Sequence, residues 1–459
     1  MHLDDHRHEL QAIADDAPPS SGDARVVVRP AVRRLWARRL LAGVVVLAVG
    51  SGAVATLARN QNHGHQVSIT GSGPAGSGPR GSGPPGTGPT GTTPALSAAT
   101  IANGRWRTIA PFPLESRQHD SAIWTGSQMI VWGGDNGQRV FGDGAAYDPV
   151  TNTWRALPPA PIAARTFAAV VWTGREMFVW GGVRAYVGSY TSDCAAFDPV
   201  TWKWRAISAA PLSARYGADA VWTGKEVIVF GGSDSNTYAA TRLDAAAYDP
   251  ATDRWKQIAP MPGVDNATVE DLRFVWTGNK LFVWEFWSGT VGNLDLRRQQ
   301  LVEYDPNDDS WRHGPAPDDP HRNVYAPIWT GDEIVSAAEP PLCDLPDGAQ
   351  NCGPPPTNLQ GGEFDPATGT WRSMPHGPAD DGESASVWTG ADLVVLSGQV
   401  KDRATGRTIV EAGTAAAWNP LTNAWTSLPR APFADSLATG FWTGREILIW
   451  GADGGIEYR

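Results

Sequence analysis

The 459-residue sequence lacks the local patterns that mark common catalytic sites. No Ser-His-Asp order, no pair of carboxylates at a defined spacing and no phosphate-binding loop stands out. Basic residues are outnumbered, because 37 Lys and Arg face 48 Asp and Glu and give a net charge of −11. This balance argues against a nucleic-acid partner. Sulfur is also scarce, with 3 Cys and 5 Met, whereas Trp reaches 22.

One uncharged hydrophobic segment, Leu40 to Ala58, has the length of a membrane span. Its 19 residues extend about 28 Å as a helix, close to the thickness of bilayer hydrocarbon. Six arginines and no acid occupy residues 25–39, so the positive-inside rule places residues 1–39 in the cytoplasm as a disordered tail. We expect a single-pass signal anchor in the cell membrane. A cleaved secretory signal, ending near Ala53-Val54-Ala55, is the alternative.

Residues 59–103 are rich in Gly, Ser, Pro and Thr and predict a disordered linker. Their repeat has a period of five rather than three, which excludes collagen. The remaining chain, residues 104–459, carries 28 Lys and Arg against 42 Asp and Glu, a formal charge of −14. We expect this part to fold outside the cytoplasm.

The tripeptide Trp-Thr-Gly recurs through this domain at intervals of 48 to 59 residues. Self-similarity near 50 residues is typical of a propeller or a solenoid. Each occurrence lies between two apolar runs, and the second run often ends in Gly-Gly. An aromatic residue before Asp-Pro or Asn-Pro follows, and then another Trp. The first tryptophans of the seven units are Trp124, Trp172, Trp222, Trp276, Trp329, Trp388 and Trp442.

Each unit therefore predicts four short antiparallel strands. Gly174 illustrates the first turn, where a tight hairpin needs a permissive φ. The Asp-Pro loop predicts a positive φ at its fifth residue, which suits Asn152 but leaves Trp202, its counterpart in the second unit, without an explanation.

The Gly-Gly doublet followed by Tyr and then Trp resembles the kelch repeat, and the resemblance covers residues 104–459. It implies an all-β, seven-bladed β-propeller related to the central domain of galactose oxidase. The chain ends on a match to a third strand, while a match to a fourth strand surrounds Trp106. We therefore expect the N-terminal strand to complete blade 7 and to close the ring, which removes both free sheet edges.

Variable loops of a repeat protein collect on its binding face. Here the variable loops join strands 2 and 3 or connect blades, and we expect ligands on that face. Seven residues before the Trp-Thr-Gly tryptophan, a slot predicted to rim the central channel holds an arginine in blades 1, 2, 3 and 5. These arginines are candidate ligands for acidic groups, or they pair with neighbouring acids. The candidate binding residues are Arg117, Arg165, Arg215, Arg322, Asp381 and Asp435 from this slot, and Trp287 from blade 4.

Cys343 and Cys352 bracket a Pro-rich insertion in blade 5 and are expected to form a disulfide. Cys194 is expected to be a buried strand residue. We predict no metal site, no cofactor and no catalytic residue. The favoured function is a membrane-anchored extracytoplasmic module that binds protein or glycan. The alternatives are a cell-surface carbohydrate-active enzyme resembling galactose oxidase or a sugar-acid epimerase, and a signalling receptor that works through residues 1–39.

Overall fold

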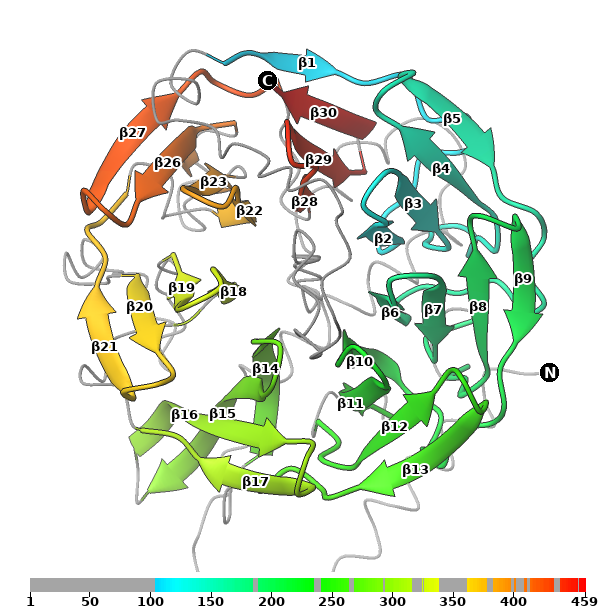
Figure 1. Cartoon of the computed structure of the whole chain (residues 1–459), viewed down its shortest axis with the longest axis horizontal. Helices are drawn as coiled ribbons and strands as arrows, with labels where there is room; N and C mark the ends of the chain where they lie inside the picture. Colours follow the sequence, from blue (N-terminus) through cyan, green and yellow to red (C-terminus); the bar gives the residue numbers. More distant parts are fainter. Residues whose placement is uncertain are drawn as a thin grey trace, which may run out of the picture. The chain divides into compact units, whose positions relative to one another are not determined.

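Seven four-stranded antiparallel sheets form a ring around one axis in the computed structural model (Figure 1). Each sheet is one blade, whose first strand lies nearest the axis and whose fourth strand lies at the outer rim. The predicted seven-bladed propeller is therefore confirmed. The structure describes residues 104–459 except 185–188, 235–240, 264–267, 292–293, 316–323, 325, 338–360, 378–382, 398–399, 402–407, 411–412, 433–437 and 453.

The first four blades follow the order of the chain. Blade 1 contains β2 (Ser121–Trp124), β3 (Met129–Trp132), β4 (Gly144–Asp148) and β5 (Thr153–Ala156). Blade 2 contains β6 (Ala169–Trp172), β7 (Met177–Trp180), β8 (Cys194–Asp198) and β9 (Lys203–Ala206). Blade 3 contains β10 (Tyr216–Trp222), β11 (Val227–Ser233), β12 (Ala245–Asp249) and β13 (Arg254–Ile258). Blade 4 contains β14 (Thr268–Trp276), β15 (Leu281–Val291), β16 (Leu294–Asp305) and β17 (Ser310–His313).

The last three blades include one added hairpin and the closing strand. Blade 5 contains β18 (Ile328–Trp329), β19 (Ile334–Ser336), β20 (Gly362–Asp365) and β21 (Thr370–Ser373). Blade 6 contains β22 (Glu383–Trp388), β23 (Leu393–Ser397), β26 (Ala415–Asn419) and β27 (Ala424–Leu428), with the hairpin β24 (Val400–Lys401) and β25 (Thr408–Val410) inserted. Blade 7 contains β28 (Thr439–Trp442), β29 (Ile447–Gly451), β30 (Gly454–Tyr458) and β1 (Trp106–Thr108).

The two ends of the domain pair with each other, as predicted. Strand β1 lies antiparallel to β30, with Trp106 opposite Tyr458 in the register. The rings of these two residues lie 4.7 Å apart. Just beyond them, the Arg105 amide donates to the Arg459 carbonyl at 2.7 Å. Blade 7 is therefore closed by strand pairing and by an aromatic contact between residues more than 350 positions apart.

The Trp-Thr-Gly sequence forms a tight hairpin turn. In blade 2, the Thr173 amide donates to the Glu176 carbonyl and the Glu176 amide donates to the Thr173 hydroxyl, both at 3.0 Å. Between them Gly174 has a φ of 83°, a left-handed value that glycine adopts without strain. The glycine of every other unit also has a positive φ. The repeated tripeptide thus specifies the turn between the two inner strands.

The loop between the third and fourth strands carries a left-handed residue at its fifth position in blades 1 to 6. The φ angles are 51° at Asn152, 59° at Trp202, 54° at Asp253, 53° at Asp309, 69° at Gly369 and 49° at Asn423. In blades 1, 3, 4 and 6 this residue accepts a hydrogen bond from the aromatic side chain of the third strand. The donor–acceptor pairs are Tyr147–Asn152, Tyr248–Asp253, Tyr304–Asp309 and Trp418–Asn423.

This pairing explains Trp202, for which the sequence offered no reason. The third strand of blade 2 carries Phe197, which has no polar hydrogen to donate. The Trp202 ring instead packs edge-on against Phe197, with centroids 5.3 Å apart. The Arg155 guanidinium of blade 1 lies 3.7 Å from the centroid of the Trp202 ring, so packing and a cation–π contact offset the strained backbone.

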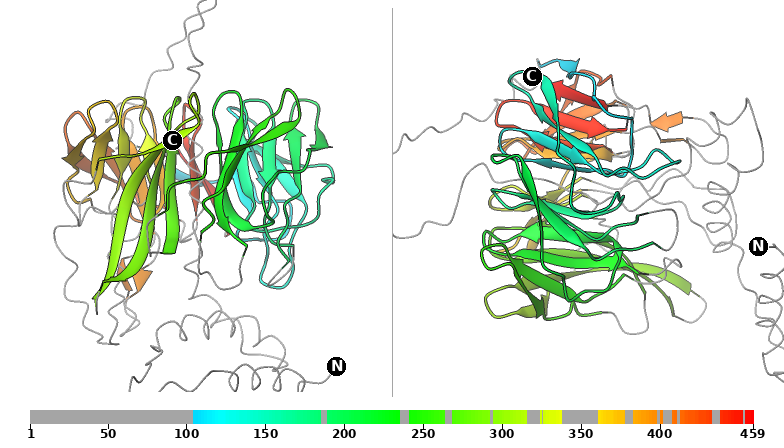
Figure 2. Two further views of the ribbon diagram at one scale, coloured as in Figure 1. Left: turned by 90° about the horizontal axis from the view of Figure 1, so that it is seen from below. Right: turned by 90° about the vertical axis from the view of Figure 1, so that its right-hand side faces the viewer.

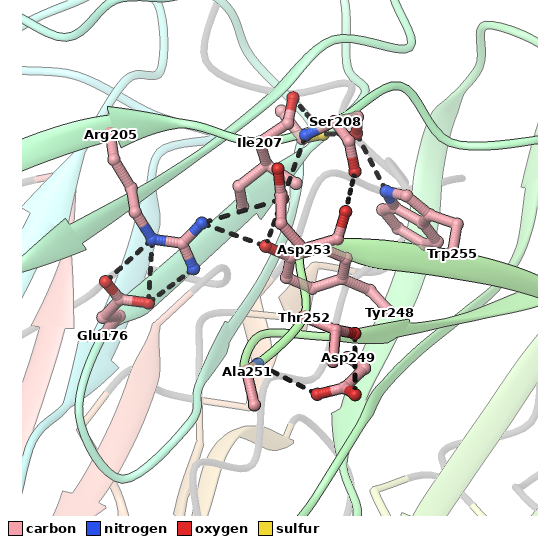
Figure 3. A network of polar contacts seen from close by, with 11 residues as sticks. Glu176, Arg205, Ile207, Ser208, Tyr248, Asp249, Ala251, Thr252, Asp253 and Trp255 are labelled. Carbon is pink, nitrogen blue, oxygen red and sulfur yellow. Dashed lines mark hydrogen bonds and ion pairs between the residues drawn. The ribbon is translucent and has the colours of Figure 1, made fainter.

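In blades 1 to 4, 6 and 7, the tryptophan of the fourth strand donates a hydrogen bond to the backbone that follows the preceding blade. Trp255 of blade 3 donates its indole N–H to the Ser208 carbonyl, which follows blade 2, at 2.9 Å. Figure 3 shows this seam, where Arg205 pairs with Glu176 and donates to the Tyr248 hydroxyl at 3.0 Å. Equivalent bonds run from Trp154 to Ala110, Trp204 to Pro158, Trp311 to Ala259, Trp425 to Pro375 and Trp106 to Pro429.

The hydrophobic core lies between blades. Because side chains alternate along a strand, Met177 and Val179 pack in the cluster shared with blade 1, while Phe178 and Trp180 pack in the cluster shared with blade 3. Cys194 is 2% exposed in β8 and belongs to the second cluster, which confirms the prediction that it is a buried strand residue.

Two hairpins project on the same side of the ring (Figure 2). In blade 4, β15 and β16 stay paired from Leu281–Tyr304 at the inner end to Val291–Leu294 at the tip. In blade 6, β24 and β25 form the second hairpin. Both belong to connections between second and third strands. We call this side, which also carries the connections between blades, the 2–3 face.

Several predictions fall on residues outside the described part of the chain. These are the tail 1–39, the span 40–58, the linker 59–103 and the Cys343–Cys352 disulfide. Among the described residues, no helix has the length and hydrophobicity to cross a membrane.

Candidate functional site

The three described arginines of the predicted slot are buried and form ion pairs with partly exposed aspartates on the 2–3 face. Arg117, Arg165 and Arg215 each have a side chain that is 0% exposed. Their partners stand immediately before the third strand of the same blade. The closest charged atoms are 2.9 Å apart for Arg117–Asp143, 2.9 Å for Arg165–Asp193 and 2.8 Å for Arg215–Asp244.

Each arginine also donates a hydrogen bond to a backbone carbonyl at the end of the second strand. Arg165 donates from Nη1 to the carbonyl of Gly181, the first glycine of the doublet, at 3.0 Å. The second glycine, Gly182, donates its amide to the Arg215 carbonyl of the next blade at 2.8 Å. A Cβ on Gly182 would lie 2.7 Å from the Thr166 carbonyl oxygen. The Gly-Gly doublet is therefore needed for close approach of two backbones.

The contacts match the ion-pair interpretation of these arginines, and they do not form an open rim. Their donors are directed to Asp carboxylates and to backbone carbonyls within the blade. A ligand-binding role for them stays a prediction. Arg322, Asp381 and Asp435 lie outside the described residues. Trp287 lies in β15, opposite Val269 and Arg298, and its side chain lies outside the described part.

A second feature lies two residues after each arginine, at the start of the innermost strands. His119 and Phe167 both have a φ of 54°, and Gly217 has a φ of 61°. The Phe167 amide donates to the His119 carbonyl at 3.4 Å, and the Gly217 amide donates to the Phe167 carbonyl at 3.1 Å. Left-handed backbone therefore recurs in blades 1 to 3 and joins them near the axis. Strain at two non-glycine residues is typical of functional positions.

The His119 ring is fixed by a carboxylate from the neighbouring loop. His119 Nδ1 lies 2.9 Å from Asp135 Oδ2. The Thr166 hydroxyl of blade 2 donates to the same oxygen at 3.2 Å. Burial alone would raise the pKa of Asp135, but the hydrogen bonds and charge interaction with His119 and the amide of Gly137 lower it below its usual value. Asp135 thus stays ionised and links blades 1 and 2.

Aromatic rings continue from His119 across blades 1 to 3. The centroids of His119 and Phe167 are 4.3 Å apart, those of Phe167 and Tyr216 are 6.4 Å apart, and Tyr216 stacks on Tyr190 at 5.2 Å with an interplanar angle of 21°. All four side chains are partly exposed. We call His119, Phe167, Tyr190 and Tyr216 the aromatic arc.

Cys194, the cysteine in the described part of the structure, is held within the core. The Cys194 thiol points to the Ser208 carbonyl, with Sγ and O 3.3 Å apart, and burial raises its pKa to about 12. No group of three or more His, Cys, Asp or Glu among the described residues could hold a metal ion.

The aromatic arc was missed by the sequence analysis, although a positional signal exists. Aligned on the arginine, Gln118, Thr166 and Tyr216 occupy the next position, and His119, Phe167 and Gly217 the one after. A glycine in register with a histidine and a phenylalanine indicates a left-handed position, and bulky residues there would be strained.

Residues 87–284 match the KLHDC2/KLHL20/DRC7 Kelch-repeats domain. The matched segment covers blades 1 to 3 and the beginning of blade 4. Over these blades the seven-bladed propeller is similar to kelch repeats. Kelch domains typically act as protein-interaction modules. Comparison of the chain with curated proteins gives no match.

Proposed function

We propose that this kelch propeller is a protein-binding module and that its ligand contacts the aromatic arc on the 2–3 face. The observation that carries the proposal is the exposure of four adjacent aromatic rings beside strained backbone at His119 and Phe167. Aromatic side chains with few rotatable bonds are preferred anchors of binding energy.

The surroundings of the arc support this role. Buried arginine–aspartate pairs fix the backbone on which the arc stands. The two projecting hairpins of blades 4 and 6 lie on the same face. The opposite face carries the repeated turns, whose chemistry hardly changes from blade to blade. A rigid support beneath variable loops is the usual arrangement of a recognition surface.

The test uses a variant that removes a ring without straining the fold. Phe167→Gly deletes the central ring of the arc, and Gly217 shows that glycine suits this position in blade 3. The matched control is Val200→Ala in the same blade, because Val200 is 89% exposed in the loop between the third and fourth strands on the opposite face. Random peptides displayed on phage are selected on the full-length chain, and single clones are then measured against each variant.

We expect selected peptides to bind the wild type and Val200→Ala equally and to lose tenfold or more in affinity for Phe167→Gly. Truncation of a hot-spot aromatic residue costs about 2 kcal/mol or more, which is at least this factor. Peptides that bind Phe167→Gly as well as the wild type would contradict the proposal. A glycan array probed in parallel distinguishes protein from sugar, because a Phe167-dependent glycan signal without peptide binding would overturn the assignment to protein.

We also propose that the propeller is held outside the cytoplasm by residues 40–58. The support is the length of this uncharged segment and the six arginines before it. A membrane-impermeant amine reagent applied to intact cells should label the exposed Lys225 of the propeller, and the protein should stay in the membrane after alkaline extraction. Labelling only after lysis would contradict the orientation, and release by alkali would favour the cleaved signal.

A further inference from the structure

The buried ion pairs on the 2–3 face have a defined orientation. In each pair the arginine is fully buried, whereas the carboxylate is 51% exposed at Asp143, 35% at Asp193 and 36% at Asp244. The face therefore presents the negative member of each pair to solvent. This orientation agrees with the alternative in which these arginines pair with neighbouring acids.

These carboxylates are held in the charged form. Burial would raise the pKa of Asp193, but hydrogen bonds from Arg165 and Thr191 and the charge of Arg165 lower it to about 2. The hydrogen bonds from Arg215 likewise lower the pKa of Asp244 below its usual value. Both groups remain negative throughout the physiological pH range.

The exposed arginines of blades 1 to 3 on this face are also paired with acids. Arg139 Nη2 lies 2.5 Å from Glu115 Oε1, and Arg242 Nη2 lies 2.5 Å from Asp234 Oδ2. Arg184 shares Asp193 with Arg165, at 3.0 Å. In this described region, an acidic ligand would have to compete with an existing carboxylate for each of these guanidinium groups.

We propose that the segment recognised by the aromatic arc is cationic. The inference rests on the proposed function and adds the chemistry of the partner. The faces of the rings attract Lys and Arg side chains. The partly exposed carboxylates of Asp143, Asp193 and Asp244 lie on the same face as the arc, and residues 104–459 carry a formal charge of −14 that attracts cations from a distance. The partner is thus a protein segment with Lys or Arg close to apolar residues.

The probes are two fluorescent pools of random peptides of equal length. One pool has Lys and Arg as its only charged residues, and the other has Asp and Glu. Fluorescence anisotropy with the full-length chain is measured at 25 mM and at 250 mM NaCl. We expect tighter binding of the cationic pool and a loss of about tenfold at the higher salt, because screening weakens interactions between exposed charges. Equal binding of the two pools, or tighter binding of the acidic one, would overturn the inference.

A pair of double variants tests whether the arc is the source of this preference. Glu115→Gln with Asp234→Asn removes one exposed and one partly buried negative charge from the 2–3 face, together with the ion pairs to Arg139 and Arg242. Asp308→Asn with Asp332→Asn removes two exposed charges from the turns of blades 4 and 5 on the other face. Net charge changes equally in both.

The first double variant should bind the cationic pool about threefold to tenfold more weakly at low salt, as two charges near a polycationic ligand imply. The second should stay within about twofold of the wild type. Equal losses in the two variants would show an effect of net charge alone and overturn the site. Phe167→Gly separates the two proposals. If peptide binding depends on Phe167 but the acidic pool binds more tightly than the cationic pool, the arc is still a protein-binding site and the proposal of a cationic partner is wrong.

Discussion

Glu285 offers a measurable link between pH and stability, because it is a buried carboxyl group at the place where blade 4 lacks the usual glycine doublet. The side chain is fully buried in β15, opposite Leu272 of β14 and Gln300 of β16. One oxygen accepts a hydrogen bond from Gln300, and the other has no hydrogen-bond partner among the residues that the structure describes. Burial outweighs the bond from Gln300 and raises the pKa of Glu285 to about 7.

The consequence for stability follows from the direction of this shift. The folded protein holds a proton on Glu285 between about pH 4.5, the usual value, and about pH 7. Because the folded protein binds this proton more tightly than the unfolded chain does, the contribution of Glu285 to the unfolding free energy is fully present below pH 4.5 and is lost as the pH rises through 7. A rise of the pKa from 4.5 to about 7 corresponds to about 3 kcal/mol. Glu285→Gln imitates the protonated form, so it should stabilise the fold by up to about 3 kcal/mol at pH 8 and by nearly nothing at pH 4.5.

The assay is urea unfolding of the wild type and Glu285→Gln from pH 4.5 to pH 8. The difference in unfolding free energy between the two proteins should grow with pH and level off above pH 8. A matched control is Gln300→Glu in the partner position, which should destabilise at high pH. A difference that stays constant with pH, or a variant less stable than the wild type at pH 8, would refute the argument from burial.

Three further predictions follow from the fold and the site. Removal of residues 454–459 should lower the melting temperature of the whole domain and expose the amides of β1, since Trp106 loses its partner strand; calorimetry that shows no change would disprove ring closure. Phe167→Gly should change the unfolding free energy by less than about 1 kcal/mol, because relief of left-handed strain offsets lost ring contacts; a larger loss in urea unfolding would give the ring a structural role. Arg165→Met should destabilise by about 1–2 kcal/mol, because the buried carbonyls of Gly181 and Asp193 lose their hydrogen bonds while the Asp193 carboxylate stays partly exposed and paired with Arg184; an unchanged denaturation midpoint would show that the pair is dispensable.

The ring architecture was predictable because it is repeated in the sequence. A Trp-Thr-Gly turn has the same hydrogen bonds in each blade, so one local rule applied seven times gives seven inner hairpins. Closure was also predictable, since a third-strand match at Tyr458 and a fourth-strand match at Trp106 require each other. Periodicity determines these features without knowledge of long-range contacts.

The functional surface was less predictable because it depends on which member of each contact is exposed. The slot for Arg117, Arg165 and Arg215 was found from the sequence, but the spacing gave no sign that Asp143, Asp193 and Asp244 would cover them. The aromatic arc joins residues from three blades and one loop, and their proximity arises only when the ring has formed. Contacts between residues so far apart in sequence cannot be recognised from the sequence alone, whereas the positive φ angles of His119 and Phe167 mark the site in the structure.

The central claim is that ligand binds to the arc on the 2–3 face of a closed ring. Hydrogen–deuterium exchange of the full-length chain, with and without a saturating peptide selected on the wild type, tests it most directly. Protection at the starts of β6 and β10, which adjoin Phe167 and Tyr216, with unchanged exchange at the Trp-Thr-Gly turns, is the predicted result. Protection confined to the Trp-Thr-Gly turns would place the binding surface on the opposite face and contradict the account.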